Sequence, residues 1–242
     1  MRHKTFILLI VLYSLTSKVN ATIIEQGNYW AKIDNENSVS LTLDDDNYLL
    51  EIISFDNFTN VSFSLIISKG KFFLKNDILK LKDTFSGYEL NLETKKDKLI
   101  CIGNSFKWLK EKELILFNKN VSISSSTSIS SCEKLVTLLE SNFKYNNNHN
   151  TLYYGNYSIG IDYRFNLNLK KQNKVLFSFR NLILLEGTFK RYKNLLIFRD
   201  HSLCFNFYFS INHNAVSSFA FPCLDKNLMI YGGNTPDREL SK

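Results

Sequence analysis

The sequence is poor in the residues on which metal and catalytic sites depend. Only 4 of the 242 residues are histidine, and the three beyond the N-terminal segment have no partner at metal-ligand spacing: His149, His201 and His213. The chain has no H-x-x-H, C-x-x-C or G-x-S-x-G motif, and no S-x-x-K arrangement singles out a nucleophile. The acidic run 44–46 lacks the glycine and distal glutamate of a calcium loop, so we interpret it as a solvated turn. We therefore expect no enzyme activity, no metal site and no cofactor.

Long apolar runs are also scarce. The N-terminal one, Phe6 to Leu15, is a largely apolar stretch that follows Arg2 and Lys4 and is too short to span a bilayer comfortably. Small residues precede a cleavage point after Ala21, so residues 1–21 are typical of a signal peptide; the alternative is an uncleaved membrane anchor. No later segment reaches 18 uninterrupted apolar residues. We expect a secreted or periplasmic/extracellular protein with no transmembrane segment after cleavage.

The excess of positive charge is small. The formal net charge of the whole chain is +7, and removal of residues 1–21 takes away Arg2, Lys4 and Lys18 and no acidic residue, which leaves +4. This charge is too low to argue for a nucleic-acid partner. The mature chain of about 220 residues has room for two domains of about 100 residues, each able to hold a hydrophobic core.

The four cysteines all lie in the mature part of the chain, and an even number in an exported protein favours disulfides over metal binding or nucleophilic catalysis. Three pairings are open to four cysteines. Proximity in the sequence favours Cys101 with Cys132 and Cys204 with Cys223.

The chain contains one segment twice. Residues 70–83, GKFFLKNDILKLKD, lie over residues 187–200, GTFKRYKNLLIFRD, at an offset of 117, and the glycine, the phenylalanine and the closing aspartate coincide. The glycines of Gly27-Asn28-Tyr29 and Gly155-Asn156-Tyr157 are 128 residues apart, so the first copy carries about 11 extra residues, mostly near 51–60. This repetition predicts two copies of one supersecondary unit.

Both copies have the period-2 alternation of half-buried strands, as at Val39, Leu41 and Leu43. Each copy contains about eight or nine such short segments with turns between them, which predicts an all-β chain of two tandem repeats, each a small antiparallel β-barrel or β-sandwich. Ser130 and Glu133 have the spacing of a capping box, which predicts one short helix after a Ser-rich linker. The expected divisions are a signal peptide 1–21, a first β-repeat 22–121, a linker and helix 122–152, a second β-repeat 153–234 and a polar tail 235–242.

Four sequons begin at asparagines that are glycosylation candidates only if the cell is a eukaryote: Asn57, Asn60, Asn120 and Asn156. Their significance depends on the organism, because a chain rich in asparagine produces such sequons by chance.

Cations gather on one hairpin of each copy. They are Lys69, Lys71, Lys75, Lys80 and Lys82 in the first copy, and Lys190, Arg191, Lys193 and Arg199 in the second. We interpret them as the polar outer face of a hairpin, with lysines protecting an edge strand from pairing. The alternative is a footprint for an anionic glycan or an anionic lipid surface. The phenylalanines Phe205, Phe207 and Phe209 are assigned to the core, with an aromatic lining around an apolar ligand as the alternative.

The motif Gly27-Asn28-Tyr29-Trp30, with Gly70-Lys71-Phe72 and the segment 79–83 later, resembles the small lipocalin-like β-barrels of bacterial envelope proteins, and the second copy repeats the pattern from Gly155. The resemblance implies a barrel in each copy and identifies no binding residue. We expect an exported, non-enzymatic binding protein for a small apolar ligand or an envelope partner. The alternative is an extracellular structural or adhesion module that contacts protein or glycan.

Overall fold

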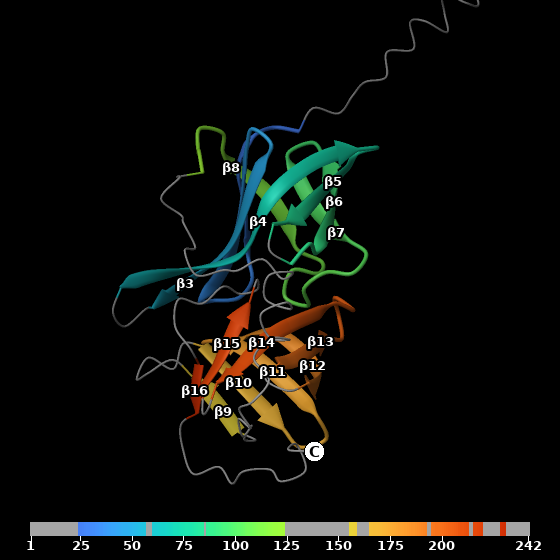
Figure 1. The fold of residues 1–242 in the computed structure, drawn as a ribbon. Helices are drawn as coiled ribbons and strands as arrows, with labels where there is room; N and C mark the ends of the chain where they lie inside the picture. Colours follow the sequence, from blue (N-terminus) through green and yellow to red (C-terminus); the bar gives the residue numbers. More distant parts are fainter. Residues whose placement is uncertain are drawn as a thin grey trace, which may run out of the picture.

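The fold was analysed in a computed structural model of the chain. The structure describes residues 24–56, 60–84, 86–123, 155–158, 165–192, 195–212, 215–219 and 228–230. All regular secondary structure in these ranges is β, as the sequence predicts, and they form sixteen strands (Figure 1). The described ranges contain no helix with the length and hydrophobicity needed to cross a bilayer. The predicted linker helix and the signal peptide lie outside the described residues.

The first eight strands form a closed antiparallel barrel in which each strand pairs with the next and β8 returns to β1. The closure decides between the two predicted architectures in favour of a barrel. The far ends of β3 and β4 project beyond the barrel (Figure 1). The strands are β1 Gly27–Lys32, β2 Asn37–Asp44, β3 Asn47–Asp56, β4 Val61–Lys75, β5 Ile78–Asp83, β6 Glu89–Lys95, β7 Lys98–Ile102 and β8 Glu113–Asn118.

The remaining eight strands form a second antiparallel sheet in the same neighbour order, and β16 pairs with β9 so that this sheet also closes. The strands are β9 Gly155–Ser158, β10 Phe165–Lys170, β11 Lys174–Phe179, β12 Leu182–Tyr192, β13 Leu195–Asp200, β14 Asn206–Asn212, β15 Ala215–Phe219 and β16 Leu228–Ile230.

Several local irregularities occur at positions 117 residues apart. The β3–β4 register skips Ile67, and the β11–β12 register skips Leu184, so both ladders contain one extra residue at the same place. Gly70 and Gly187 each lie so close to the next strand that an added Cβ would be 2.0 Å from Lys82 O and 1.9 Å from Arg199 O, respectively. A glycine is therefore required at each position, which explains two of the residues shared by the repeated segments.

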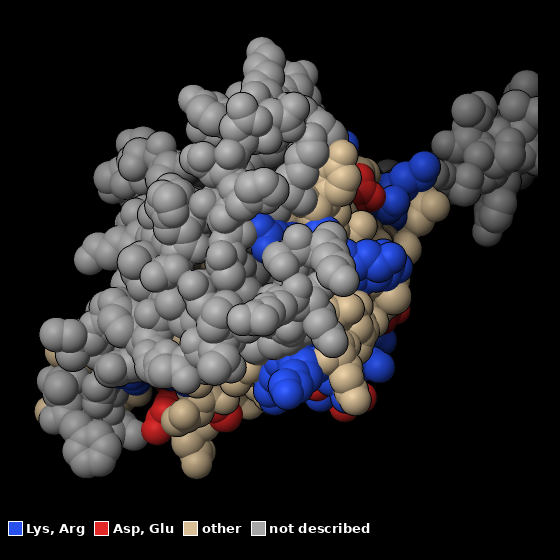
Figure 2. All heavy atoms as spheres, turned by 60° about the horizontal axis from the view of Figure 1, so that its bottom comes forward, with Lys and Arg blue, Asp and Glu red and all other residues tan. Residues whose placement is uncertain are grey.

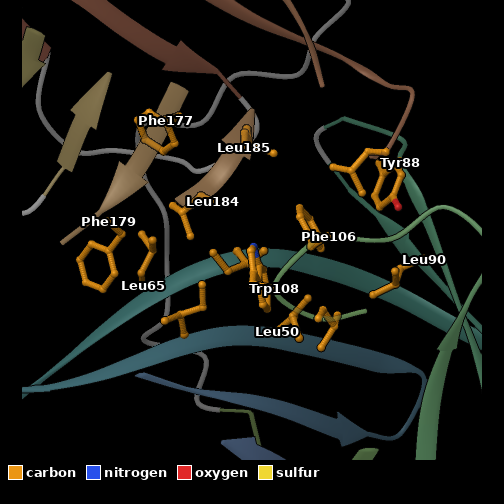
Figure 3. Packing of buried hydrophobic residues seen from close by; sticks show 14 of the residues in the cluster. Leu50, Leu65, Tyr88, Leu90, Phe106, Trp108, Phe177, Phe179, Leu184 and Leu185 are labelled. Atoms are coloured by element: carbon orange, nitrogen blue, oxygen red, sulfur yellow. The ribbon is translucent and has the colours of Figure 1, made fainter. Parts of the chain in front are cut away.

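The two sheets share one continuous hydrophobic cluster. At their junction Leu65 lies beside Phe179, and Phe106 and Trp108 face Leu184 and Leu185 of β12 (Figure 3). Outside this cluster, the Arg180 guanidinium donates to Ser54 Oγ at 3.3 Å and to the Phe55 carbonyl at 3.4 Å. An ion pair of 3.5 Å joins Lys107 Nζ to Glu186 Oε2. The two sheets therefore pack against each other and bury apolar surface between them.

Candidate functional site

The interior of the first barrel is filled by aliphatic side chains. Inward-facing residues alternate with outward-facing ones along the strands, apart from the extra residue on β4. Leu41 on β2 and Leu50 on β3, for example, lie opposite each other and both are buried. A side chain with none of its surface accessible to water has no water-sized space beside it. The inward residues with 0% exposure are Val39, Leu41, Leu43, Ile52, Leu79, Leu92 and Leu114.

The described inward side chains of the second barrel include several phenylalanines that pack against one another. Phe177 and Phe198 each contact Phe209, with ring centroids 6.2 and 6.3 Å apart, in the range typical of packed aromatic pairs. The assignment of Phe207 and Phe209 to the core is confirmed, because both are buried; Phe205 is half-buried and contacts Phe207. The fully buried residues of this barrel are Leu167, Phe177, Leu196, Phe198, Phe209 and Val216, each with 0% exposure.

The end of the first barrel that faces the second is covered by the segment 103–112 between β7 and β8. Phe106 and Trp108 stack with ring centroids 4.9 Å apart, and both are buried at the junction. The Trp108 Nε1–H donor has no hydrogen-bond partner in the described part of the chain. At the same junction, the ring of Tyr88 contacts the ring of Phe205 of the second barrel, with ring centroids 5.3 Å apart. Burial, and next the nearby Cys101 and Asp200, raise the pKa of Tyr88.

Two buried aspartates close equivalent corners of the barrels. Asp83 Oδ2 accepts from Ser68 Oγ at 2.7 Å, and its Oδ1 accepts from the backbone N–H of Ser86 at 2.6 Å. Asp200 Oδ2 accepts from the N–H of Glu186 at 2.9 Å, and its Oδ1 accepts from two further backbone amides. The sequence marks these residues only as the closing aspartates of the repeat. Because both oxygens of each carboxylate are engaged by donors in the chain, we assign the pair a structural role.

The acidic turn is engaged by donors of the chain, and only one of the three histidines lies within the described residues. Asp44 Oδ2 accepts from the Ile123 N–H at 2.8 Å, Asp45 is exposed, and Asp46 forms an ion pair of 2.6 Å with Lys71. The hydrogen bond from Lys71 lowers the pKa of Asp46. His201 is exposed in the turn after β13, while His149 and His213 lie outside the described residues. No group of three potential ligands occurs within the described ranges.

The predicted disulfides are not supported by the structure. Cys101 and Cys204 are free thiols, whereas their proposed partners Cys132 and Cys223 lie outside the described residues. Cys101 points inward from β7, where it pairs with Leu92, and burial raises the pKa of its thiol to about 12. Cys204 is exposed in the turn before β14, with its Sγ 3.5 Å from the His201 carbonyl oxygen.

We expect the two thiols to react at very different rates. Iodoacetamide at pH 8 should modify Cys204 readily in the folded protein, whereas Cys101 should react fast only after unfolding, because its thiol is half-buried and, with its raised pKa, almost entirely protonated. Peptide mapping by mass spectrometry, with and without denaturant, measures both. Recovery of a peptide that joins Cys101 to Cys132, or Cys204 to Cys223, would contradict the free-thiol arrangement and restore the predicted pairing.

The glycosylation candidates within the described ranges are exposed: Asn60 follows the tip of the β3–β4 hairpin, Asn120 follows β8, and Asn156 is on β9. Asn57 lies outside the described residues. The sequons therefore stay predictions that depend on the organism.

The outer faces carry exposed apolar side chains. Trp30 of β1 lies opposite Ile115 of β8, and their exposures are 39% and 46%. The β1–β8 register shifts at Asn28 and Tyr29, beside Phe117, which is 80% exposed. On β4, Phe73 is 45% exposed.

The comparisons with known proteins give no match. No family model, no curated protein and no solved structure matches the chain. The function proposed below therefore rests on the geometry of the barrel interiors, their junction and their outer faces. Sequence reasoning found the interior residues through their period-2 pattern but missed Phe106 and Trp108, because a junction between distant segments leaves no local pattern.

Proposed function

We propose that this chain is an exported, non-enzymatic binding protein made of two copies of one barrel, and that it contacts an extracellular or envelope partner with its outer faces. The filled interiors carry the proposal. A protein that carries an apolar ligand inside a β-barrel needs a cavity for it, whereas the inward side chains of both barrels lie against one another without a water-sized space at the positions of 0% exposure.

The duplication is supported by contacts that recur at an offset of 117. The Thr84 N–H donates to the Lys69 carbonyl, and the His201 N–H donates to the Glu186 carbonyl. The Asp83 N–H likewise donates to Tyr88 O, and the Asp200 N–H to Phe205 O. Eight strands in up-and-down order also agree with a lipocalin-like origin, which stays a proposal.

A joint action of the two copies is supported by the way they meet. Tyr88 and Phe205 are equivalent residues in the two copies, and their rings contact each other. Equivalent residues meet in this manner on the axis of a two-fold symmetric dimer. We infer that the two copies pack against each other like the two subunits of a dimer joined in one chain. The outer faces of the two barrels are then held at a fixed distance from each other.

Native mass spectrometry of the mature protein, before and after organic extraction, tests the outer-face proposal. We expect the bare mass of the chain in both samples. A bound lipid-sized mass that extraction removes would contradict the proposal and make the barrels carriers. Phe198→Ala, which opens a cavity in the second barrel, provides the control: added benzene should be retained by this variant and not by the wild-type protein.

A further inference from the structure

We propose that the outer face of β4 and β5 in the first barrel binds an anionic polysaccharide. This inference rests on the proposed contact through outer faces and adds the chemistry of the partner. The surface, called the lysine strip below, consists of Lys71, Phe73 and Lys75 on β4 and Lys80 and Lys82 on β5.

The strand register places these side chains in a compact array. Lys71 lies opposite Lys82, and Phe73 lies opposite Lys80. Lys71 and Lys75 are four residues apart on one strand, a span of roughly 13 Å at 3.3 Å per residue. Lys80 Nζ lies 5.9 Å from the centroid of the Phe73 ring, so a cation of β5 stands close to the aromatic ring of β4.

The charge of the strip is only partly neutralised by the chain. Lys71 pairs with Asp46 at 2.6 Å. Lys82 lies opposite Glu89 on β6, yet within the described residues Lys75, Lys80 and Lys82 form no ion pair. The uncompensated positive charge of the strip is that of Lys75, Lys80 and Lys82. An external anion would therefore be attracted to this face.

Protection of an edge strand does not explain these lysines. In the closed barrel β4 pairs with β3 and β5, and β5 pairs with β4 and β6, so neither strand has a free edge. The lysines do lie on the polar outer face of the β4–β5 hairpin, as the sequence predicts, but the assignment of these lysines to edge protection is wrong. The fold does not require them either, since β12 and β13 hold Thr188, Lys190, Tyr192, Ile197 and Arg199 at the positions 117 residues later.

A polysaccharide fits this surface better than a membrane does. The half-exposed Phe73 ring offers an apolar face to a sugar ring, while ammonium groups on both strands reach carboxylate or sulfate groups along an extended chain. A side chain that inserts into a bilayer has to protrude beyond its polar neighbours, whereas the Lys80 ammonium lies only 5.9 Å from the centroid of the Phe73 ring, whose side chain is 45% exposed. Figure 2 shows one face of the molecule, on which exposed Lys and Arg side chains gather in groups with acidic side chains beside some of them.

The test measures the affinity of the mature protein for dextran sulfate, polygalacturonate and neutral dextran by affinity electrophoresis. We expect retardation by the two anionic polymers, loss of the retardation at high salt, and none with neutral dextran. Lys75→Ala/Lys80→Ala/Lys82→Ala should weaken binding roughly tenfold. Phe73→Ala should weaken it at unchanged charge.

The matched control removes the same charge elsewhere. Lys32→Ala/Lys110→Ala/Lys170→Ala changes three exposed lysines outside the strip and should leave the affinity within about twofold. Equal losses in the two triple variants would overturn the proposal, because net charge alone would then explain binding. Thermal melting confirms that each variant is folded, and Lys75→Ala/Lys82→Ala replaces the strip triple if Lys80 proves necessary for folding.

Two further results would overturn the inference and separate it from the proposed function. No binding to either anionic polymer, with a bare native mass, would reject the polysaccharide and leave outer-face contact standing. Co-sedimentation with phosphatidylglycerol vesicles that the strip triple abolishes, without binding to the polymers, would replace the polysaccharide by a membrane surface. A bound, extractable lipid in native mass spectrometry would instead reject the proposed function itself.

Discussion

Gly187→Ala should be the most destabilising single-methyl substitution in the second barrel. The added Cβ would lie 1.9 Å from Arg199 O and 2.9 Å from a ring carbon of Phe198, so the backbones of β12 and β13 would have to move apart. Overpacking typically costs about 1–3 kcal/mol, and we expect about 3 kcal/mol here because the clash is with backbone. For a chain of this length the loss lowers the melting temperature by roughly 6–12 °C, as measured by circular dichroism. Gly70→Ala should act alike in the first barrel, where Cβ would meet Lys82 O at 2.0 Å.

Gly87→Ala is the matched control, because no atom lies within 4 Å of its added Cβ. Its φ of 70° costs an alanine about 1 kcal/mol, and Cys204 already adopts a φ of 53° 117 residues later. An insoluble Gly187→Ala protein beside a soluble Gly87→Ala protein agrees with the expectation. Melting temperatures that fall equally in both variants would show that the close approach of β12 and β13 is not maintained in solution.

Asp200→Ala should have the second large effect. Its carboxylate, only 3% exposed, accepts from the backbone amides of Glu186, Ser202 and Leu203 at 2.9, 2.8 and 2.7 Å. Removing it leaves the buried Leu203 N–H and two part-buried amides without an acceptor, and a buried unsatisfied donor costs about 1–3 kcal/mol. We expect a loss of about 3 kcal/mol or more in the free energy of unfolding, measured by urea denaturation. The free energy of unfolding of Asp200→Asn should lie between those of the wild-type protein and Asp200→Ala, because the asparagine amide keeps one acceptor oxygen.

Asp46→Ala provides the comparison for Asp200→Ala. Asp46 also accepts a short bond, from Lys71 at 2.6 Å, but both side chains are mostly exposed and solvent competes for the pair. The urea midpoint of Asp46→Ala should therefore differ little from that of the wild-type protein. If Asp200→Ala unfolds at the same urea concentration as Asp46→Ala, the corner at 200–203 does not depend on the buried carboxylate.

The amino-acid sequence by itself determined the local features of the molecule. The alternation at Val39, Leu41 and Leu43 predicts β2 because neighbouring side chains of a strand point to opposite faces. The recurring glycines and closing aspartates identify Gly70, Gly187, Asp83 and Asp200 as equivalent, although not why they are needed. Turns such as 44–47 follow from residue types that tolerate a positive φ, as Asp45 does.

Only the tertiary structure decided how these strands close and meet. Pairing of β1 with β8 joins residues about 90 positions apart, and nothing in either strand specifies its partner. Closure removed the free edges that the lysines were expected to protect, and the described inward side chains pack against one another. Phe106, Trp108 and Tyr88 became junction residues because they face a second barrel. Local sequence sets which face of a strand is apolar, whereas the neighbours of that face are set by long-range packing.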